Sequence, residues 1–265
     1  MNIIGIIPGR MASSRFPGKP LAKICGIPMI GHVYLRSKMS KTMNEVYVAT
    51  CDKQIKEYMG SLGGQAVMTA ATHERASDRA AEAVLKIEKA TGKKADIIVM
   101  IQGDEPLTYP GMIDEAVKPL LADKSLKITN LMAAIKNQRE FEDPNEVKVV
   151  VDKFNNALYF SREPIPSRKK ANSNVTMLKQ VCIIPFRREF LLEYTKMKPT
   201  PLEIFESVDM MRILENGLKV KMVLTKFETK SVDTQADLDK VSAMMVSDKL
   251  FKRYGRDERR RYKKT

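Results

Sequence analysis

The chain has 265 residues, of which 43% are hydrophobic, and its formal net charge at pH 7 is +14. This size suits one α/β domain with a small subdomain and excludes two large independent domains. The three cysteines are too scattered for a disulfide framework or a zinc site, and no apolar run reaches the roughly 18 residues that a membrane span requires. Because the sequence begins directly with an apolar strand, we expect a cytoplasmic protein.

Apolar runs rich in β-branched residues alternate with segments of helical period, which predicts a mostly parallel sheet with helices on both faces. The expected strands are residues 3–8, 45–50, 65–68, 97–101, 128–134, 147–151, 180–185 and 219–224. The expected helices are residues 28–37, 52–62, 77–89, 110–122, 187–195 and 202–215. Residues 136–175 are richer in Pro, Asn and charge, which predicts an excursion from the sheet that forms a lid or a dimer contact.

The positive charge is concentrated at the C-terminus. Residues 249–265 contain nine Lys or Arg and two acids, which accounts for half of the net charge. We predict a main domain over residues 1–248 followed by a solvated basic tail that is frayed or weakly helical. Contact of this tail with RNA, an acidic membrane or an acidic partner is the alternative.

A basic loop follows the first expected strand. Residues 8–20 read P-G-R-M-A-S-S-R-F-P-G-K-P and combine small residues, hydroxyl groups and three cations. Backbone N–H groups and cationic side chains in such a loop can surround phosphate oxygens, although it matches neither the Walker nor the Rossmann dinucleotide pattern. Composition alone leaves open both a phosphate site and a basic surface loop.

A buried strand at residues 97–101 ends abruptly in polar residues, Gln102, Gly103, Asp104 and Glu105. A carboxylate at the end of such a strand can hold Mg²⁺ against nucleotide phosphates, because this hard ion prefers oxygen ligands. The alternative for Asp104 is a helix N-cap. Residues 231–238 read locally as the start of another helix.

Together, these motifs resemble those of the CMP-Kdo synthetases, the 3-deoxy-manno-octulosonate cytidylyltransferases. The family's I-I-P-A-R-x-x-S-T-R-x-P-G-K-P-L is I-I-P-G-R-M-A-S-S-R-F-P-G-K-P-L at residues 6–21, and its V-Q-G-D-E-P is I-Q-G-D-E-P at 101–106. Its A-L-Y-F-S-R stands at 157–162, and its V-D-T-P-E-D-L is V-D-T-Q-A-D-L at 232–238. The resemblance implies an α/β, three-layer nucleotidyltransferase fold, Rossmann-like and glycosyltransferase-A-like, with a mostly parallel sheet, a small inserted subdomain and a homodimeric assembly.

The resemblance also implies site residues and a reaction. The residues expected to bind CTP are Arg10, Ser13, Ser14, Arg15, Lys19, Arg79 and Gln102, with Gln102 helping to read cytosine. Asp104 and Asp233 would converge on Mg²⁺, and the catalytic set would be Arg10, Lys19, Asp104 and Asp233. The anomeric hydroxyl of an acidic sugar would attack the α-phosphorus of CTP in line and release pyrophosphate.

The chain departs from the family pattern in two places. The H-Q-S-G-T-[DE]-R loop is H-E-R-A-S-D-R at residues 73–79, and the H-L-G-I-Y-x-Y-R stretch is Q-V-C-I-I-P-F-R at 180–187. Because a polyol with unpaired hydroxyl groups is disfavoured in a pocket, we expect a Kdo-like acid other than Kdo. The expected contacts to this acceptor are Arg162, Gln180, Arg187 and Asp209, with structural ion pairs as the alternative for the two arginines.

Two other hypotheses compete with this prediction. One is a related nucleotidyltransferase with a non-sugar acceptor or a different nucleotide, against which the 102–106 motif and Asp233 argue. The other is a catalytically inactive protein that binds nucleic acid or an acidic surface through its basic tail. The retained carboxylate pair argues against it, and the eight tyrosines show no pattern typical of single-strand binding, so nucleic acid is not an expected partner.

Overall fold

The computed structural model describes residues 1–12, 16–168, 175–228 and 230–262, and side chains as far as residue 255. The chain forms two compact units, with unit 1 made of Met1–Asp114 and Glu228–Thr265 and unit 2 of Glu115–Phe227. Unit 2 is therefore inserted within the predicted domain over residues 1–248. Unit 1 also includes the residues that were predicted to form a tail. Among the described residues, no helix is both long enough and apolar enough to cross a membrane.

Unit 1 is built on parallel strands in the order β6–β1–β4–β5. Their bounds are β1 (Ile3–Gly9), β4 (Glu45–Thr50), β5 (Ala66–Met68) and β6 (Ile97–Ile101). The strands β1 and β6 are almost continuously apolar because both of their faces are buried. A short hairpin of β2 (Lys23–Ile24) and β3 (Ile27–Pro28) follows the 3-10 helix η1 (Lys19–Leu21).

The helices of this first sheet are α1 (Met29–Ser37), α2 (Lys53–Ser61) and α3 (Ala76–Thr91). The chain runs outward from β1 to β4 and β5 and then returns to β6, and crossovers of this kind are right-handed. The outward and returning connections therefore place α1 and α2 on one face and α3 on the other. Because the connections after β1 and β6 diverge, a crevice opens at the carboxyl ends of these two strands.

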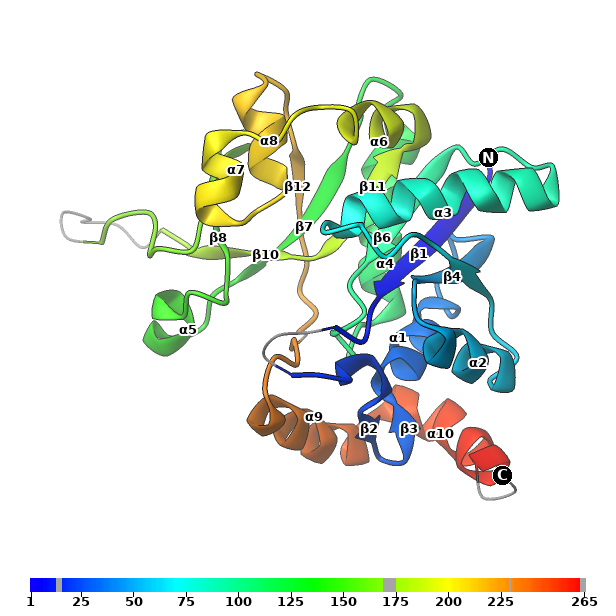
Figure 1. Ribbon diagram of the computed structural model, residues 1–265. Helices are drawn as coiled ribbons and strands as arrows, with labels where there is room; N and C mark the ends of the chain where they lie inside the picture. Colours follow the sequence, from blue (N-terminus) through cyan, green and yellow to red (C-terminus); the bar gives the residue numbers. More distant parts are fainter. Residues whose placement is uncertain (13–15, 169–174, 229, 263–265) are drawn as a thin grey trace. The chain divides into compact units, whose positions relative to one another are not determined.

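The C-terminal segment is an ordered part of unit 1. It forms α9 (Gln235–Ser247) and α10 (Lys249–Tyr262), which lie beside the β2–β3 hairpin (Figure 1). Leu250, Phe251 and Tyr254 of α10 are buried in one apolar cluster with residues of α9 and of the hairpin. The prediction of a solvated tail is therefore wrong for residues 249–255, because apolar side chains three and four positions apart give this basic helix one packing face.

Unit 2 contains a second sheet in the order β12–β7–β10–β8–β9. Its strands are β7 (Thr129–Ala134), β8 (Lys148–Val151), β9 (Ala157–Ser161), β10 (Leu178–Val181) and β12 (Lys221–Leu224). Only the β12–β7 pair is parallel. The helix α4 (Pro110–Ala122) leads into this unit, which also holds α5 (Gln138–Glu142), β11 (Ile183–Arg187), α6 (Arg188–Tyr194), α7 (Pro201–Glu206) and α8 (Met210–Glu215).

Two expected elements of unit 2 differ from the observed ones. The expected strand at residues 180–185 is two strands, β10 and β11, separated at Cys182. The expected helix at residues 202–215 is α7 and α8, because Ser207 adopts a left-handed conformation with φ of 52° and ends α7. The 136–175 excursion contributes α5, β8 and β9 in its described part, the two strands belonging to the second sheet, and its role as a lid or dimer contact stays a prediction.

A buried ion pair holds α7 and α8 together. Arg212 donates from Nε to Glu203 Oε2 at 2.7 Å and from its terminal nitrogen to Oε1 at 2.6 Å, and both side chains are almost fully buried. The guanidinium also lies over the Tyr194 ring, 4.7 Å from the centroid. The paired geometry compensates for the removal of both charges from water.

Replacement of Glu203 by Gln should lower the free energy of unfolding by about 3 kcal/mol, because it leaves the Arg212 charge buried without a counter-ion. Urea denaturation followed by circular dichroism measures this loss. The control is Glu193→Gln, which breaks an exposed 3.7 Å pair with Lys127 and should change the value by less than about 0.5 kcal/mol. Equal effects of the two substitutions would contradict the structural role of the buried pair.

Candidate active site

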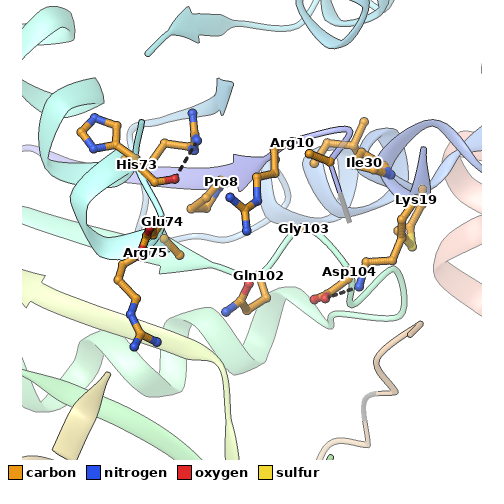
Figure 2. A pocket seen from close by; sticks show the side chains of 16 residues that line it. Pro8, Arg10, Lys19, Ile30, His73, Glu74, Arg75, Gln102, Gly103 and Asp104 are labelled. Atoms are coloured by element: carbon orange, nitrogen blue, oxygen red, sulfur yellow. Dashed lines mark hydrogen bonds and ion pairs between the residues drawn. The ribbon is translucent and has the colours of Figure 1, made fainter. Parts of the chain in front are cut away.

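A pocket of about 340 Å³ lies at the carboxyl ends of β1 and β6 in unit 1 (Figure 2). Its lining residues are Pro8, Gly9, Arg10, Ala12, Lys19, Pro20, Met29, Ile30, His73, Glu74, Arg75, Ala76, Arg79, Gln102, Gly103 and Asp104. Four of them are Lys or Arg and two are Asp or Glu, so the lining favours an anion. The pocket stands where the topology of the sheet opens its crevice.

Two glycines shape the loops that form this pocket. A Cβ atom on Gly103 would lie 2.8 Å from the carbonyl oxygen of Pro8, so any larger residue would push the loop after β6 away from β1. Gly18 has a φ of 74° and donates its N–H to the carbonyl of Met11 at 3.1 Å, which closes the first loop. The left-handed turn at Gly18 directs the chain into η1, whose first residue is Lys19.

Lys19 joins two carboxylates that are far apart in sequence. Its Nζ lies 2.7 Å from Asp104 Oδ2 and 3.1 Å from Asp233 Oδ1. Burial opposes the charged form of Lys19, but the carboxylates of Asp104 and Asp233 outweigh it and raise the pKa of the ammonium group. The structure therefore brings Lys19, Asp104 and Asp233 together in unit 1.

The backbone fixes Asp233 beside Asp104. The N–H of Val232 donates to the Asp104 carbonyl at 2.9 Å. Immediately after Asp233, Thr234 and Asp237 form a capping box at the start of α9. Asp233 thus stands between a backbone anchor and a capped helix, which limits the positions that its carboxylate can take.

The other predicted nucleotide ligands of the first loop are placed only in part. Arg10 is exposed at the end of β1, and the next residue, Met11, donates its N–H to Asp52 at 2.8 Å. Figure 2 shows the Arg10 side chain approaching the loop of Gln102 and Gly103 from the side of β1. Ser13, Ser14 and Arg15 lie outside the described residues. Their role in CTP binding stays a prediction.

Arg79 is committed to the backbone of the neighbouring loop. It is buried and donates to Thr69 Oγ1 at 2.6 Å, to the Ala70 carbonyl at 3.2 Å and to the His73 carbonyl at 3.4 Å. These bonds give Arg79 a structural role in the wall of the pocket. Its predicted contact with a phosphate stays a prediction.

Glu82 on α3 supports the same wall and was not recognised in the sequence. It accepts hydrogen bonds from Lys86, from the Ala70 N–H at 2.8 Å and from the His73 ring. Burial opposes its ionisation, but these donors outweigh burial and lower the pKa of Glu82 to about 2. No motif marks this residue, because its position one helical turn from Lys86 is typical of any exposed helix.

The predicted acceptor residues all lie in unit 2. Arg162 donates to the backbone carbonyls of Glu206 at 2.7 Å, Pro144 at 2.8 Å and Ser207 at 3.3 Å. Its three nitrogens are therefore used to hold the ends of β9 and α7 together. This arrangement corresponds to the structural alternative that the sequence left open, although the partners are carbonyl groups instead of a carboxylate.

Arg187 is used in a similar way. It donates to the carbonyls of Leu126 at 3.0 Å and Leu120 at 2.6 Å, close to the end of α4. Gln180 donates to Asn130 at 2.6 Å, and the backbone carbonyl of Asp209 accepts from Tyr194 at 3.0 Å. Acceptor binding by Arg162, Gln180, Arg187 and Asp209 stays a prediction.

The fold of this chain is shared by solved nucleotidyltransferases. A solved 4-diphosphocytidyl-2C-methyl-D-erythritol synthase from Anaerococcus prevotii has the same fold, with a TM-score of 0.59, 15% identity, and coverage of 92% of this chain and 98% of its own. The cytidylyltransferase family model matches residues 4–225.

Nearer relatives narrow this class. The 3-deoxy-manno-octulosonate cytidylyltransferase of Geobacter metallireducens is 47% identical over 91% of this chain and 96% of its own. A structure of CMP:2-keto-3-deoxy-manno-octonic acid synthetase complexed with CTP has a TM-score of 0.85 and 37% identity, covering 93% of this chain and 99% of its own. The chain therefore belongs to the CMP-Kdo synthetase family and is a CTP-dependent cytidylyltransferase, which confirms the predicted fold and enzyme class.

Replacement of Glu82 by Gln should destabilise the protein by about 1 kcal/mol at pH 7, because the neutral amide binds the Lys86 ammonium group less strongly than a carboxylate does. The depressed pKa means that the contribution of Glu82 is present above its ordinary pKa and is lost as the pH falls toward 2. Urea unfolding at pH 7 and pH 3 should therefore show a smaller difference between variant and wild type at pH 3. The control is Glu57→Gln, an exposed position on α2. A difference that grows at low pH would contradict this assignment.

Proposed function

We propose that this cytidylyltransferase transfers CMP from CTP to the anomeric hydroxyl of Kdo, with Mg²⁺ held by Asp104 and Asp233. The observation that carries the proposal is the meeting of these two carboxylates at one cation, Lys19, at the edge of an anion-binding pocket. The acceptor is proposed from the relatives, whose names specify 3-deoxy-manno-octulosonate.

The expectation of an acid other than Kdo is not supported. In this chain Val181, Ile183, Ile184 and Phe186 are buried. Apolar residues at buried positions of β10 and β11 are explained by packing, so they do not indicate a different acceptor.

The proposed reaction is a single displacement at phosphorus. The anomeric oxygen of Kdo forms a bond with the α-phosphorus of CTP, the bond from that phosphorus to the bridging oxygen breaks, and pyrophosphate leaves with the electron pair. The hydroxyl proton passes to solvent. Arg10 and Lys19 would bind the phosphates and offset their charge, while the Gln102 amide offers the donor and acceptor that a cytosine edge requires.

The carboxylates at Lys19 fit a magnesium ion. Asp104, which lines the pocket, and Asp233, which meets it at Lys19, would provide the oxygen ligands that this hard cation prefers, and the ammonium group between them supports a local field that favours positive charge. Within the described ranges, no group of three or more His, Cys, Asp or Glu is arranged around a metal position. Phosphate oxygens and water would therefore complete the coordination, as is usual for Mg²⁺ with nucleotides. The ion supplies neutralisation of phosphate charge when it is bound.

The predicted homodimer remains a proposal that rests on the family. Sedimentation equilibrium of the full chain tests it directly, since a monomer at the concentrations of the activity assay would contradict it.

Replacement of Asp104 or Asp233 by Asn should each lower kcat by roughly 100-fold or more, because the neutral amide removes an anionic ligand for the metal. The measurement is pyrophosphate release at saturating CTP and Kdo over a range of Mg²⁺ concentrations. The matched control is Asp239→Asn, an exposed carboxylate on α9 that should keep normal turnover. Full activity of either site variant would exclude the proposed metal role of that residue.

The acceptor is tested by pyrophosphate release from each of the four nucleoside triphosphates with Kdo and with its amino and deoxy analogues. We expect turnover with CTP and Kdo together, because both belong to the proposed reaction. Turnover with an analogue and none with Kdo would instead restore the altered-acceptor hypothesis. Absence of turnover by well-folded protein with every acid would favour a non-sugar acceptor.

A further inference from the structure

A buried polar cluster joins α1 to the C-terminal helices and takes no part in the proposed chemistry. We call it the Tyr254 cluster and define it as His32, Arg36, Asp248 and Tyr254. The Tyr254 hydroxyl lies 2.7 Å from His32 Nδ1 and 3.1 Å from Arg36 Nε, and Arg36 forms an ion pair with Asp248. His32 and Arg36 are 0% and 1% exposed, which means that their partners must come from the protein.

The hydrogen bonds of this cluster have a fixed direction. His32 Nε2 lies 2.8 Å from the carbonyl of Ile24, which can only accept, so Nε2 carries the proton. The Tyr254 hydroxyl therefore donates to Nδ1 and accepts from Arg36. Burial is the first cause that lowers the pKa of His32 to about 4 and raises the pKa of Tyr254 to about 12, so both groups are neutral near pH 7. Removal of the hydroxyl would leave a buried acceptor and a buried donor without their partner.

The same region supports the chain segments that carry Lys19, Asp104 and Asp233. Ile24, Leu107 and Val232 belong to the apolar cluster that contains Tyr254, and they follow Lys19, follow Asp104 and precede Asp233 in the sequence. Arg36 also donates to the Leu107 carbonyl at 3.4 Å. The short chain segments that carry Lys19, Asp104 and Asp233 thus share one support, to which α10 contributes its buried face.

Asp248 connects this support to the helix that begins beside Asp233. It separates α9 from α10 and accepts the Phe251 N–H at 2.6 Å, and its carboxylate is paired with Arg36 of α1. Both ends of α9 are therefore fixed: the first by the capping box at Thr234 and the Val232 bond to Asp104, the second by Asp248. A shift of α10 would be transmitted to Asp233 through α9.

We propose that Tyr254 is a positioning residue, and that α10 serves to hold the Asp233 carboxylate against Lys19 and Asp104. The role in metal binding rests on the proposed function of Asp104 and Asp233, whereas the positioning of Val232 and Asp233 does not. Tyr254 acts through the protein interior, since its hydroxyl is bonded to His32 and Arg36 and does not line the pocket.

The test compares Tyr254→Phe with Tyr34→Phe in the full chain. Tyr34 is also buried and bonded through its hydroxyl, to the Gln65 N–H at 3.2 Å, but it is absent from the apolar cluster of Tyr254. The first measurement is hydrogen exchange of a peptide containing Val232, without metal or nucleotide. We expect exchange in Tyr254→Phe to be roughly fivefold faster than in Tyr34→Phe, as the loss of one buried hydrogen bond implies.

The second measurement is Mn²⁺ binding followed by electron paramagnetic resonance. We expect the dissociation constant of Tyr254→Phe to rise roughly fivefold above that of Tyr34→Phe. Asp248→Asn provides a second variant, because asparagine still caps α10 but no longer pairs with the Arg36 charge, and it should act in the same direction. These variants should raise the Mn²⁺ requirement of turnover more than the KM for CTP.

The outcomes separate this inference from the proposed function. The positioning role would be overturned if the two tyrosine variants showed equal exchange and equal Mn²⁺ binding. The metal site would still stand in that case if Asp233→Asn abolished the Mn²⁺ binding seen in the wild type. Mn²⁺ binding that is insensitive to Asp104→Asn and Asp233→Asn would overturn the metal site, while faster exchange at Val232 would still support the positioning role.

Discussion

The active-site region of unit 1 depends on the ion pairs that Lys19 forms with Asp104 and Asp233. Like charges repel at short range, so two ionised carboxylates in a partly buried site are stabilised when a cation lies between them. Lys19 supplies this cation from the first loop, and the resulting contact links the beginning, the middle and the end of unit 1. Gly18, Gly103 and the Val232–Asp104 backbone bond are all required to bring these groups within reach.

Several arginines of this protein bond to backbone carbonyl groups of loops. Lys and Arg line the pocket in excess, but Arg79 is used by backbone carbonyls of the loop that it supports. Arg162 and Arg187 are used by carbonyls in the same manner in unit 2. A guanidinium group with several carbonyl partners stabilises a loop that has no regular hydrogen bonding, which is a common use of arginine besides anion binding.

The sequence predicted the parts of the fold that depend on local pattern. The bounds of β4 and β6 agree with the expected ones, because β6 is a continuous apolar run followed by polar residues and β4 is an apolar run between Glu45 and Thr50. The break at Ser207 was missed, since a left-handed residue other than glycine leaves no clear signal in sequence. The separation of β10 from β11 at Cys182 was also missed. The packing of α10 was missed because its many basic residues hid three apolar positions. The meeting of Asp104 with Asp233 was expected only from family resemblance, as no local pattern relates residues so distant in the chain.

The insertion of unit 2 between Asp114 and Glu228 has a consequence for synthesis of the protein. The ribosome makes the pocket loops of β1 and β6 early, but Asp233 and the helices that follow it emerge only after the whole inserted unit. Chains fold from the N-terminus as they are made, so a nascent polypeptide has the crevice of the first sheet long before it has the second carboxylate. The site is therefore completed only after unit 2 has been made, and a chain that terminates within unit 2 lacks it although β1, β4, β5 and β6 are already present.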